Sequence, residues 1–363
     1  MTHTPTQFTR RQVLVGSAAA AVGAVLVPAL AACAAPDKKS TGVATPKSTE
    51  AVKSDLLADL SSLKGKSIGH FVIDASTPTA ALSSAWGKQM AEEYEFSLEF
   101  FDGAADYNRV NSTLSTWASK GLDGVINTGV DPTPIQAGLD ELKDAGIPVG
   151  GICAGYVPGT GMQWDVEIND WITFAKVLTY VLDRIGDSGG GVAYYNWPQV
   201  PALLIRDSQT RAMLDFYSIP ILAEEIPVVP GQVQDIKQKT TSLLTRFPAG
   251  SDLKAIVAGW DEIGVAAAQA IEEAGRDDVF VVSSDGDLEA LDMIRDGAPF
   301  VATGARSIYE MTEICYRQLA TVVGGGDVVS TTIYVDAPLV TKDNVPPAGE
   351  YATGTGLLTF YVK

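Results

Sequence analysis

The stretch Gly121-Leu-Asp-Gly-Val-Ile-Asn-Thr-Gly-Val-Asp-Pro132 decides the fold, together with the two segments that follow it. Its apolar run, Gly124 to Asn127, is typical of a buried strand. A helix is predicted from Ile135 to Ala145, and Ile147-Pro-Val-Gly-Gly-Ile152 predicts the next strand. A strand, a helix and a second strand form a βαβ unit, which places both strands in one parallel sheet.

The same alternation extends in both directions along the chain. The predicted strands are 67–73, 96–101, 124–127, 147–152, 191–195, 219–226, 255–258, 279–282 and 300–303. The predicted helices are 80–94, 108–120, 135–145, 170–185, 205–217, 233–247, 262–274, 288–296 and 307–323. The 363 residues exceed the length at which one core usually stops growing, so two α/β lobes are expected. Ligands of open α/β sheets bind beyond the carboxyl ends of the strands, which predicts a cleft between the lobes.

The N-terminus has the pattern of an export signal. Arg10 and Arg11 precede an uncharged run from Val13 to Ala32, and the run ends in Leu30-Ala-Ala-Cys33. These features predict a signal peptide over residues 1–32. The paired arginines are typical of twin-arginine export, with the general secretory route as the alternative. The ending resembles a bacterial lipobox, in which the cysteine is lipidated and becomes the first residue.

We therefore expect a protein exported and held by a lipid on Cys33 at the outer face of the cytoplasmic membrane. An uncleaved transmembrane anchor is the alternative, because the uncharged run is long enough to span a bilayer. The run is only weakly apolar and contains a proline, which favours cleavage. Residues 33–63, rich in Ala, Ser, Thr, Lys and Pro, are predicted to be the lipidated cysteine and a flexible tether.

Charge and composition exclude some functions. Asp and Glu number 44 against 26 Lys and Arg, a net charge of −18, which argues against a nucleic-acid partner. His3 lies in the predicted leader, so His70 alone remains; we expect neither a metal site nor a cofactor. Export permits a disulfide between Cys153 and Cys315, but two buried thiols are the preferred prediction.

Five segments together resemble a known family. They are Gly121 to Pro132, Ala145-Gly-Ile-Pro-Val149, Trp260-Asp-Glu262 with Ala266-Ala-Ala268, Val281-Val-Ser-Ser-Asp-Gly286 and Leu339-Val-Thr-Lys-Asp-Asn-Val345. In this order and spacing they resemble the type I periplasmic solute-binding proteins of the ribose-binding class, which serve ABC sugar importers. The resemblance covers nearly all of residues 66–346.

The resemblance implies the periplasmic binding protein type I fold: α/β, with two Rossmann-like lobes, parallel sheets and a three-segment hinge. It assigns residues 64–167 and 306–335 to the N-terminal lobe. Residues 168–305 and 336–363 are assigned to the C-terminal lobe. The implied function is capture of a small sugar, polyol or similar polyhydroxylated solute in the interlobe cleft. The implied partners are that ligand and ABC permease subunits.

The family's binding positions transfer one by one. Asp285 is kept, Trp260 replaces the family's Asn, and Arg306 stands where the family has Gln. Arg206 matches the arginine of the second lobe's first helix, with Arg211 as the alternative if the alignment shifts by five residues. Together with residues that end other predicted strands, the predicted ligand site comprises Asp74, Ser76, Thr77, Cys153, Asn196, Trp197, Arg206, Trp260, Asp285 and Arg306.

The roles of these residues stay open at several positions. Asp285 is expected to accept hydrogen bonds from ligand hydroxyls, with a helix N-cap as the alternative. Arg306 is either a ligand donor or a hinge partner of Asp285. Trp260 either stacks on a sugar face or packs beneath the cleft. The family's Asp-Arg sugar anchor falls on Cys153 and Ala154, which favours a linear polyol, a smaller sugar or a nucleoside-like ligand.

Motifs that indicate catalysis are weak in the sequence. Gly189-Gly-Gly191 lacks the Gly-Lys-Ser/Thr ending of a phosphate loop. We therefore expect a binding protein and not an enzyme. The alternatives are an extracellular module that presents its ligand to a receptor and, less favoured, an exported carbohydrate-active enzyme.

Overall fold

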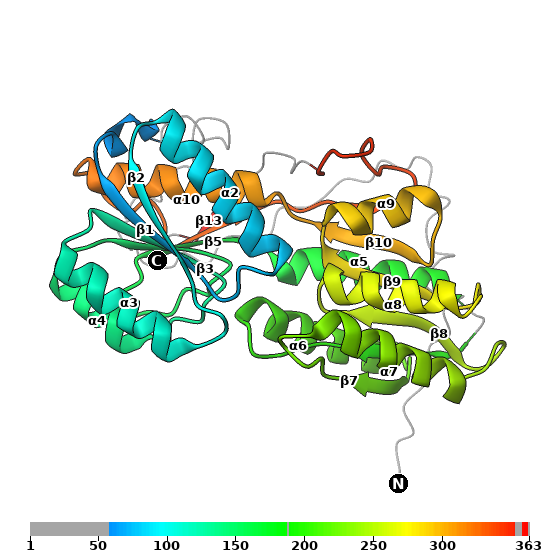
Figure 1. Cartoon of the computed structure of the whole chain (residues 1–363). Helices are drawn as coiled ribbons and strands as arrows, with labels where there is room; N and C mark the ends of the chain where they lie inside the picture. The colour runs from blue at the N-terminus through cyan, green and yellow to red at the C-terminus, as the bar shows by residue number, and fades with distance from the viewer. Residues whose placement is uncertain (1–57, 187–188, 353–357, 362–363) are drawn as a thin grey trace, which may run out of the picture. The chain divides into compact units, whose positions relative to one another are not determined.

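The computed structural model describes residues 58–186, 189–352 and 358–361. The predicted signal peptide, Cys33 and the tether up to residue 57 lie outside the described residues. Within these residues, no helix combines the length and the apolar character needed to cross a membrane. The described chain forms two sheets, each covered by helices on both faces (Figure 1).

The N-terminal lobe is built on a seven-stranded sheet in the order β13-β11-β5-β4-β3-β1-β2. Its strands are β1 (Ser67–Val72), β2 (Ser97–Asp102), β3 (Gly124–Thr128), β4 (Val149–Ile152), β5 (Trp164–Ile168), β11 (Thr332–Val335) and β13 (Leu358–Tyr361). Its helices are α2 (Pro78–Glu93), α3 (Tyr107–Lys120), α4 (Gln136–Asp144) and α10 (Ile308–Val323), preceded by the 3₁₀ turn η2 (Leu60–Leu63). Every residue of β3 is buried because helices cover both faces of this central strand.

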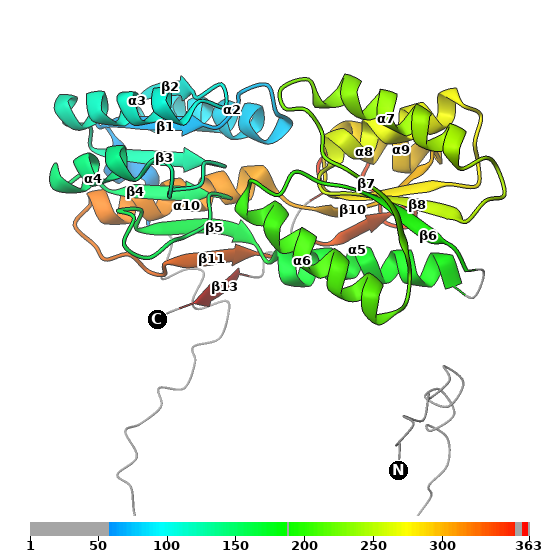
Figure 2. The ribbon, with the colours of Figure 1, turned by 90° about the horizontal axis from the view of Figure 1, so that it is seen from below.

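The C-terminal lobe is built on a six-stranded sheet in the order β12-β10-β9-β8-β6-β7. Its strands are β6 (Gly191–Tyr195), β7 (Ile221–Glu225), β8 (Leu253–Ala258), β9 (Phe280–Asp285), β10 (Phe300–Ala305) and β12 (Leu339–Thr341). Its helices are α5 (Asp170–Ile185), α6 (Pro201–Phe216), α7 (Gln232–Arg246), α8 (Asp261–Glu273) and α9 (Leu288–Asp296). Figure 2 shows both sheets from below, with α5 and α6 on the same side of the second sheet.

Nearly all neighbouring strands are parallel, as the βαβ alternation predicts. Among the strands of the described residues, only β13 on β11 and β12 on β10 are antiparallel. The chain passes between the sheets from β5 to α5, from β10 to α10, from β11 to β12 and again from β12 to β13. The first three of these passages correspond to the three segments of the expected hinge.

The structure corrects the sequence analysis at two elements. No strand is predicted between residues 152 and 170, yet Trp164–Ile168 forms β5, in which Asp165 and Glu167 interrupt the apolar pattern. Residues 336–363 were assigned whole to the C-terminal lobe, yet Leu358–Tyr361 pairs with β11 in the other sheet. This strand covers the edge that β11 would otherwise expose, which removes a row of unpaired backbone groups.

Two helix starts bring residues to the cleft. Thr77 is the N-cap of α2, where its Oγ1 accepts a hydrogen bond from the Ala80 amide at 3.4 Å, and Pro78 occupies the first helical position. Helix α6 begins at Pro201, four residues earlier than predicted, also with proline first. Both Cys153 and Cys315 are buried free thiols, as preferred from the sequence.

Candidate functional site

A cavity of about 120 Å³ lies where the carboxyl ends of strands from both sheets meet. Its lining follows β1, β3 and β4 in one lobe and β6, β8, β9 and β10 in the other. The lining residues are Ile73, Thr77, Pro78, Thr79, Ala80, Thr128, Gly129, Cys153, Trp197, Val200, Ala202, Leu203, Arg206, Val229, Gln232, Trp260, Glu262, Asp285 and Arg306.

Most of the predicted site residues line this cavity. They are Thr77, Cys153, Trp197, Arg206, Trp260, Asp285 and Arg306. Asp74, Ser76 and Asn196 are not among the lining residues. The Asp74 carboxylate accepts a hydrogen bond from the Ser76 amide at 2.9 Å and so forms the turn before α2, and Ser76 is exposed. Asn196 is buried and donates to the Leu203 carbonyl at 3.0 Å, so its side chain holds the start of α6.

Of the two arginines that the sequence offered for the site, Arg206 is the one that lines the cavity. Its side chain is 1% exposed. Nε donates to Asp170 Oδ1 at 2.7 Å, and Nη1 donates to the Gly259 carbonyl at 2.6 Å and to Asp285 Oδ1 at 3.2 Å. The alternative, Arg211, is half exposed on the same helix and pairs with Asp207 and Glu224. The cavity therefore contains Arg206 and not Arg211.

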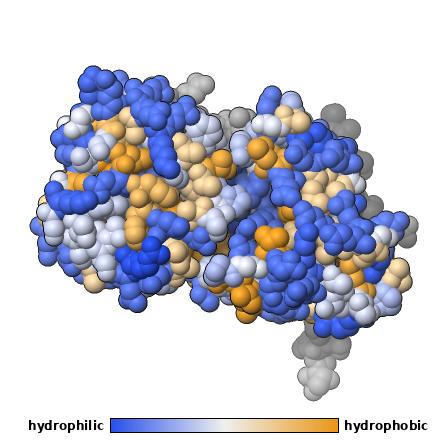
Figure 3. Space-filling model, in the orientation of Figure 1, coloured by the Kyte–Doolittle hydropathy of each residue, from blue (hydrophilic) through white to orange (hydrophobic). Residues whose placement is uncertain are grey.

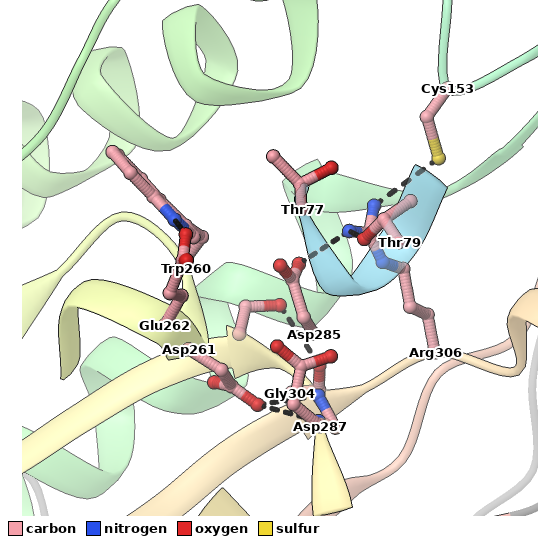
Figure 4. Close-up of polar contacts among 12 residues, drawn as sticks. Thr77, Thr79, Cys153, Trp260, Asp261, Glu262, Asp285, Asp287, Gly304 and Arg306 are labelled. Carbon is pink, nitrogen blue, oxygen red and sulfur yellow. Dashed lines mark hydrogen bonds and ion pairs between the residues drawn. The ribbon is translucent and has the colours of Figure 1, made fainter. Parts of the chain in front are cut away.

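Asp285 and Arg306 form the hinge pair that the sequence left open. Arg306 Nη2 lies 3.0 Å from Asp285 Oδ1 (Figure 4). The same oxygen lies 3.2 Å from Arg206 Nη1, so it pairs with both arginines. Arg306 also reaches the other lobe, where Nη1 donates to Cys153 Sγ at 3.3 Å and Nη2 to Thr79 Oγ1 at 2.5 Å. The alternative of Asp285 as a helix N-cap is wrong, because Asp287 holds that position in α9.

Burial and neighbouring charges set the protonation of the site. Burial lowers the pKa of Arg206, but Asp170 and Asp285 outweigh it and raise this pKa overall. The pKa of Arg306 is raised in the same way, with Asp285 as the strongest opposing cause, so both guanidiniums stay charged. Burial raises the pKa of the Cys153 thiol to about 12, which keeps it neutral. Burial and the nearby Asp285 raise the pKa of Asp261 to about 6.

A second polar group lies around Trp260, the residue before α8. Glu262 Oε2 accepts hydrogen bonds from Trp260 Nε1 at 3.3 Å and from Gln232 Nε2 at 2.9 Å. Both Gln232 and Glu262 line the cavity, and neither was predicted. Glu262 stands in the first turn of α8, where an acid is ordinary helix chemistry, and nothing in the sequence singles out Gln232.

Two further residues of the site were also missed. Thr79 lies on the first turn of α2 and receives the hydrogen bond from Arg306. Asp170 opens α5, is 3% exposed and binds Arg206. Asp170 comes directly after the first passage between the lobes, and this position could have indicated a site residue from the sequence. Its partner Arg206 is 36 residues away in the chain and comes close to it only in the folded protein.

Comparison with known proteins identifies the family. A model of the periplasmic binding protein domain matches residues 68–327, which is well over half of the chain. The protein therefore belongs to the periplasmic binding protein family. Membership confirms the fold class and the expectation of a solute-binding protein in place of an enzyme.

The curated relatives include two binding proteins. Over 254 residues the chain is 28% identical to the xylitol-binding protein of Mycolicibacterium smegmatis, with 68% of this chain and 70% of that protein covered. Over 238 residues it is 24% identical to the D-apiose import binding protein of Actinobacillus succinogenes, with 62% of this chain and 72% of that protein covered.

Solved structures have the same fold. An ABC transporter solute-binding protein from Mycobacterium smegmatis with bound glycerol has a TM-score of 0.71, with 22% identity over 80% of this chain and 100% of that chain. One from Agrobacterium vitis with bound allitol has a TM-score of 0.69, with 23% identity over 78% of this chain and 97% of that chain.

Proposed function

We propose that this protein captures a small polyol or sugar in the interlobe cavity and delivers it to the permease of an ABC importer. The carrying observation is the pair of buried arginines at the base of the cavity. Among the described residues, Arg206 Nη2 and Arg306 Nε have no hydrogen-bond acceptor. A buried N–H without an acceptor costs free energy. A ligand oxygen that accepts hydrogen bonds from these two N–H groups removes that cost, which favours binding.

Hydroxyl groups match these donors and their neighbours. A hydroxyl accepts from a guanidinium and donates to a carboxylate, and Asp285 and Glu262 supply carboxylates in the same lining. Trp197 and Trp260 supply rings for the C–H edges of a ligand. The cavity is close in size to the roughly 150 Å³ cavity that accepts one benzene molecule, which favours a small ligand.

Delivery requires that the two lobes respond to the ligand. The lining comes from both sheets, so a bound ligand contacts both lobes at once. Such a ligand stabilises the closed arrangement by contacts that an open arrangement lacks. The hinge of this motion comprises the passages after β5, β10 and β11.

We also propose that the chain is exported, cleaved before Cys33 and anchored by lipid on that cysteine, with ABC permease subunits as its partners. This proposal rests on the sequence pattern of residues 1–33. Expression in a bacterial host with radiolabelled palmitate tests it. Label in the wild type and none in Cys33→Ala supports the anchor, whereas an unlabelled, unshifted wild type contradicts it.

The ligand itself is found by binding. Purified protein is screened by thermal shift against pentitols, hexitols, pentoses, hexoses and nucleosides, and hits are measured by calorimetry. We expect stabilisation by small polyols or sugars, and loss of it in Arg206→Met but not in Arg211→Met. Stabilisation by none of these compounds, with no polyhydroxylated solute found by mass spectrometry of the purified protein, would contradict the proposal.

A further inference from the structure

The two lobes contribute different chemistry to the cavity. The N-terminal lobe supplies Ile73, Thr77, Pro78, Thr79, Ala80, Thr128, Gly129 and Cys153. None of these side chains is charged or carries an amide. The C-terminal lobe and the segment after β10 supply every charged or amide side chain of the lining, namely Arg206, Gln232, Glu262, Asp285 and Arg306. Figure 3 shows hydrophilic and hydrophobic residues on both sides of the hollow between the two halves of this face.

The three threonines of the apolar side already use their hydroxyls within the protein. Thr77 Oγ1 donates to the Asp74 carbonyl at 3.0 Å and accepts from the Ala80 amide. Thr79 Oγ1 accepts the hydrogen bond from Arg306. Each of these hydroxyls is therefore already hydrogen-bonded to a neighbouring group of the protein, and each threonine also carries an apolar methyl group.

Thr128 is held most firmly. Its Oγ1 lies 2.9 Å from His70 Nε2 and 3.1 Å from Ser83 Oγ, in a buried network that continues from His70 Nδ1 to the Tyr316 hydroxyl. Burial, with a smaller effect of Lys88, lowers the pKa of His70 to about 3, so the ring is neutral across physiological pH. The network therefore keeps the Thr128 hydroxyl turned toward the core.

Cys153 completes this side of the cavity. Its thiol is 7% exposed, stays protonated and is a weak hydrogen-bonding group. Within the described residues, no lining side chain between Ile73 and Cys153 is charged or carries an amide, and the charged group that contacts this wall is Arg306, which follows β10.

We infer that the ligand has a hydroxyl-rich edge for the C-terminal lobe and an apolar edge for the N-terminal lobe, as in a deoxy or methyl-substituted polyol or sugar. This inference rests on the proposed function and names its ligand class. A fully hydroxylated compound would leave a hydroxyl without a partner against Ile73, Ala80 and the three threonine methyls, which costs free energy. A methyl group in the same place is buried at a gain.

Matched ligand pairs test the inference. Calorimetry compares D-ribose with 5-deoxy-D-ribose, D-galactose with D-fucose and xylitol with 1-deoxyxylitol. In each pair that binds, we expect the deoxy compound to bind at least tenfold more tightly, which is about 1.4 kcal/mol. Equal or tighter binding of the hydroxylated member overturns the inference and leaves the proposed function standing. Binding of no member of any pair, or of the broader panel, overturns both.

A pair of cysteine variants shows which wall sets the preference. Cys153→Ser replaces a weak hydrogen-bonding group in the cavity by a hydroxyl of nearly the same size. We expect it to reduce the ratio of deoxy to hydroxylated affinity at least threefold. Cys315→Ser is the control, because Cys315 is a buried thiol that packs in the core and does not line the cavity. A ratio unchanged in Cys153→Ser, or changed equally in both variants, contradicts an apolar wall formed at Cys153.

Discussion

Two arginines five positions apart on helix α6 allow a sharp test of the site. Arg206 is 1% exposed and Arg211 is 48% exposed in its side chain. Replacing each by methionine keeps most of the side-chain length and removes only the charge and the donors. Arg206→Met removes the partner of Asp170, whose carboxylate is 3% exposed and is paired with Arg206 at 2.7 Å.

The size of the effect follows from burial. Breaking a buried ion pair by removal of one partner costs about 3–5 kcal/mol, because the remaining charge is left without compensation. Asp285 keeps Arg306 at 3.0 Å, so one carboxylate and not two is left unpaired in Arg206→Met. The ion pairs of Arg211 with Asp207 and Glu224 are exposed, and such pairs contribute about 0–1 kcal/mol. We expect a loss of about 3 kcal/mol in the first variant and less than about 1 kcal/mol in the second.

Urea denaturation followed by circular dichroism gives both free energies of unfolding, and calorimetry with a ligand found in the screen gives affinity. We expect at least a tenfold loss of affinity, about 1.4 kcal/mol, in Arg206→Met and none in Arg211→Met. Equal destabilisation of the two variants, or unchanged affinity in Arg206→Met, would refute the assignment of Arg206 to the site.

Three further predictions follow from the same region. Asp285→Asn is expected to weaken ligand binding at least tenfold in calorimetry. Asp278→Asn is the control and should leave affinity unchanged, because the Asp278 carboxylate pairs with Arg276 outside the cavity. Equal effects of the two variants would contradict a role for Asp285 in binding. The folded-state pKa of Asp261 is about 6, above the ordinary value of 3.8, so the folded protein binds more protons between these values and stability falls as pH rises from about 4 to about 6. Denaturation curves across this range should show a smaller fall in Asp261→Asn, and an identical fall would argue against the raised pKa. Since the pKa of Cys153 is about 12, iodoacetamide at pH 8 should modify it at least a hundredfold more slowly than the same cysteine in urea, as read by mass spectrometry; rapid labelling of the native protein would show an accessible thiolate.

Much of the architecture could be read from local patterns. Strand and helix periods are properties of neighbouring residues, so the βαβ order and most elements were predicted within a few residues. Strand β5 was missed because Asp165 and Glu167 break its apolar run, and Asp165 is tolerated there only because the Ala154 and Gly155 amides donate to its carboxylate. The residues of strand β13 were assigned to the wrong lobe. Their pairing with β11 joins two separate segments of the chain, and local sequence patterns do not report such a contact.

From the amino-acid sequence alone, the class of the protein could be assigned, and Trp260, Asp285 and Arg306 were predicted as site residues, which the structure places in the cavity lining. The folded structure was needed to choose between Arg206 and Arg211, to join Arg306 to Thr79 across 227 residues, and to turn the Thr128 hydroxyl toward His70, 58 residues away. Periodicity reports which face of an element is buried. The partner of a buried hydrogen-bonding group is set by contacts between distant segments, which local periodicity does not report.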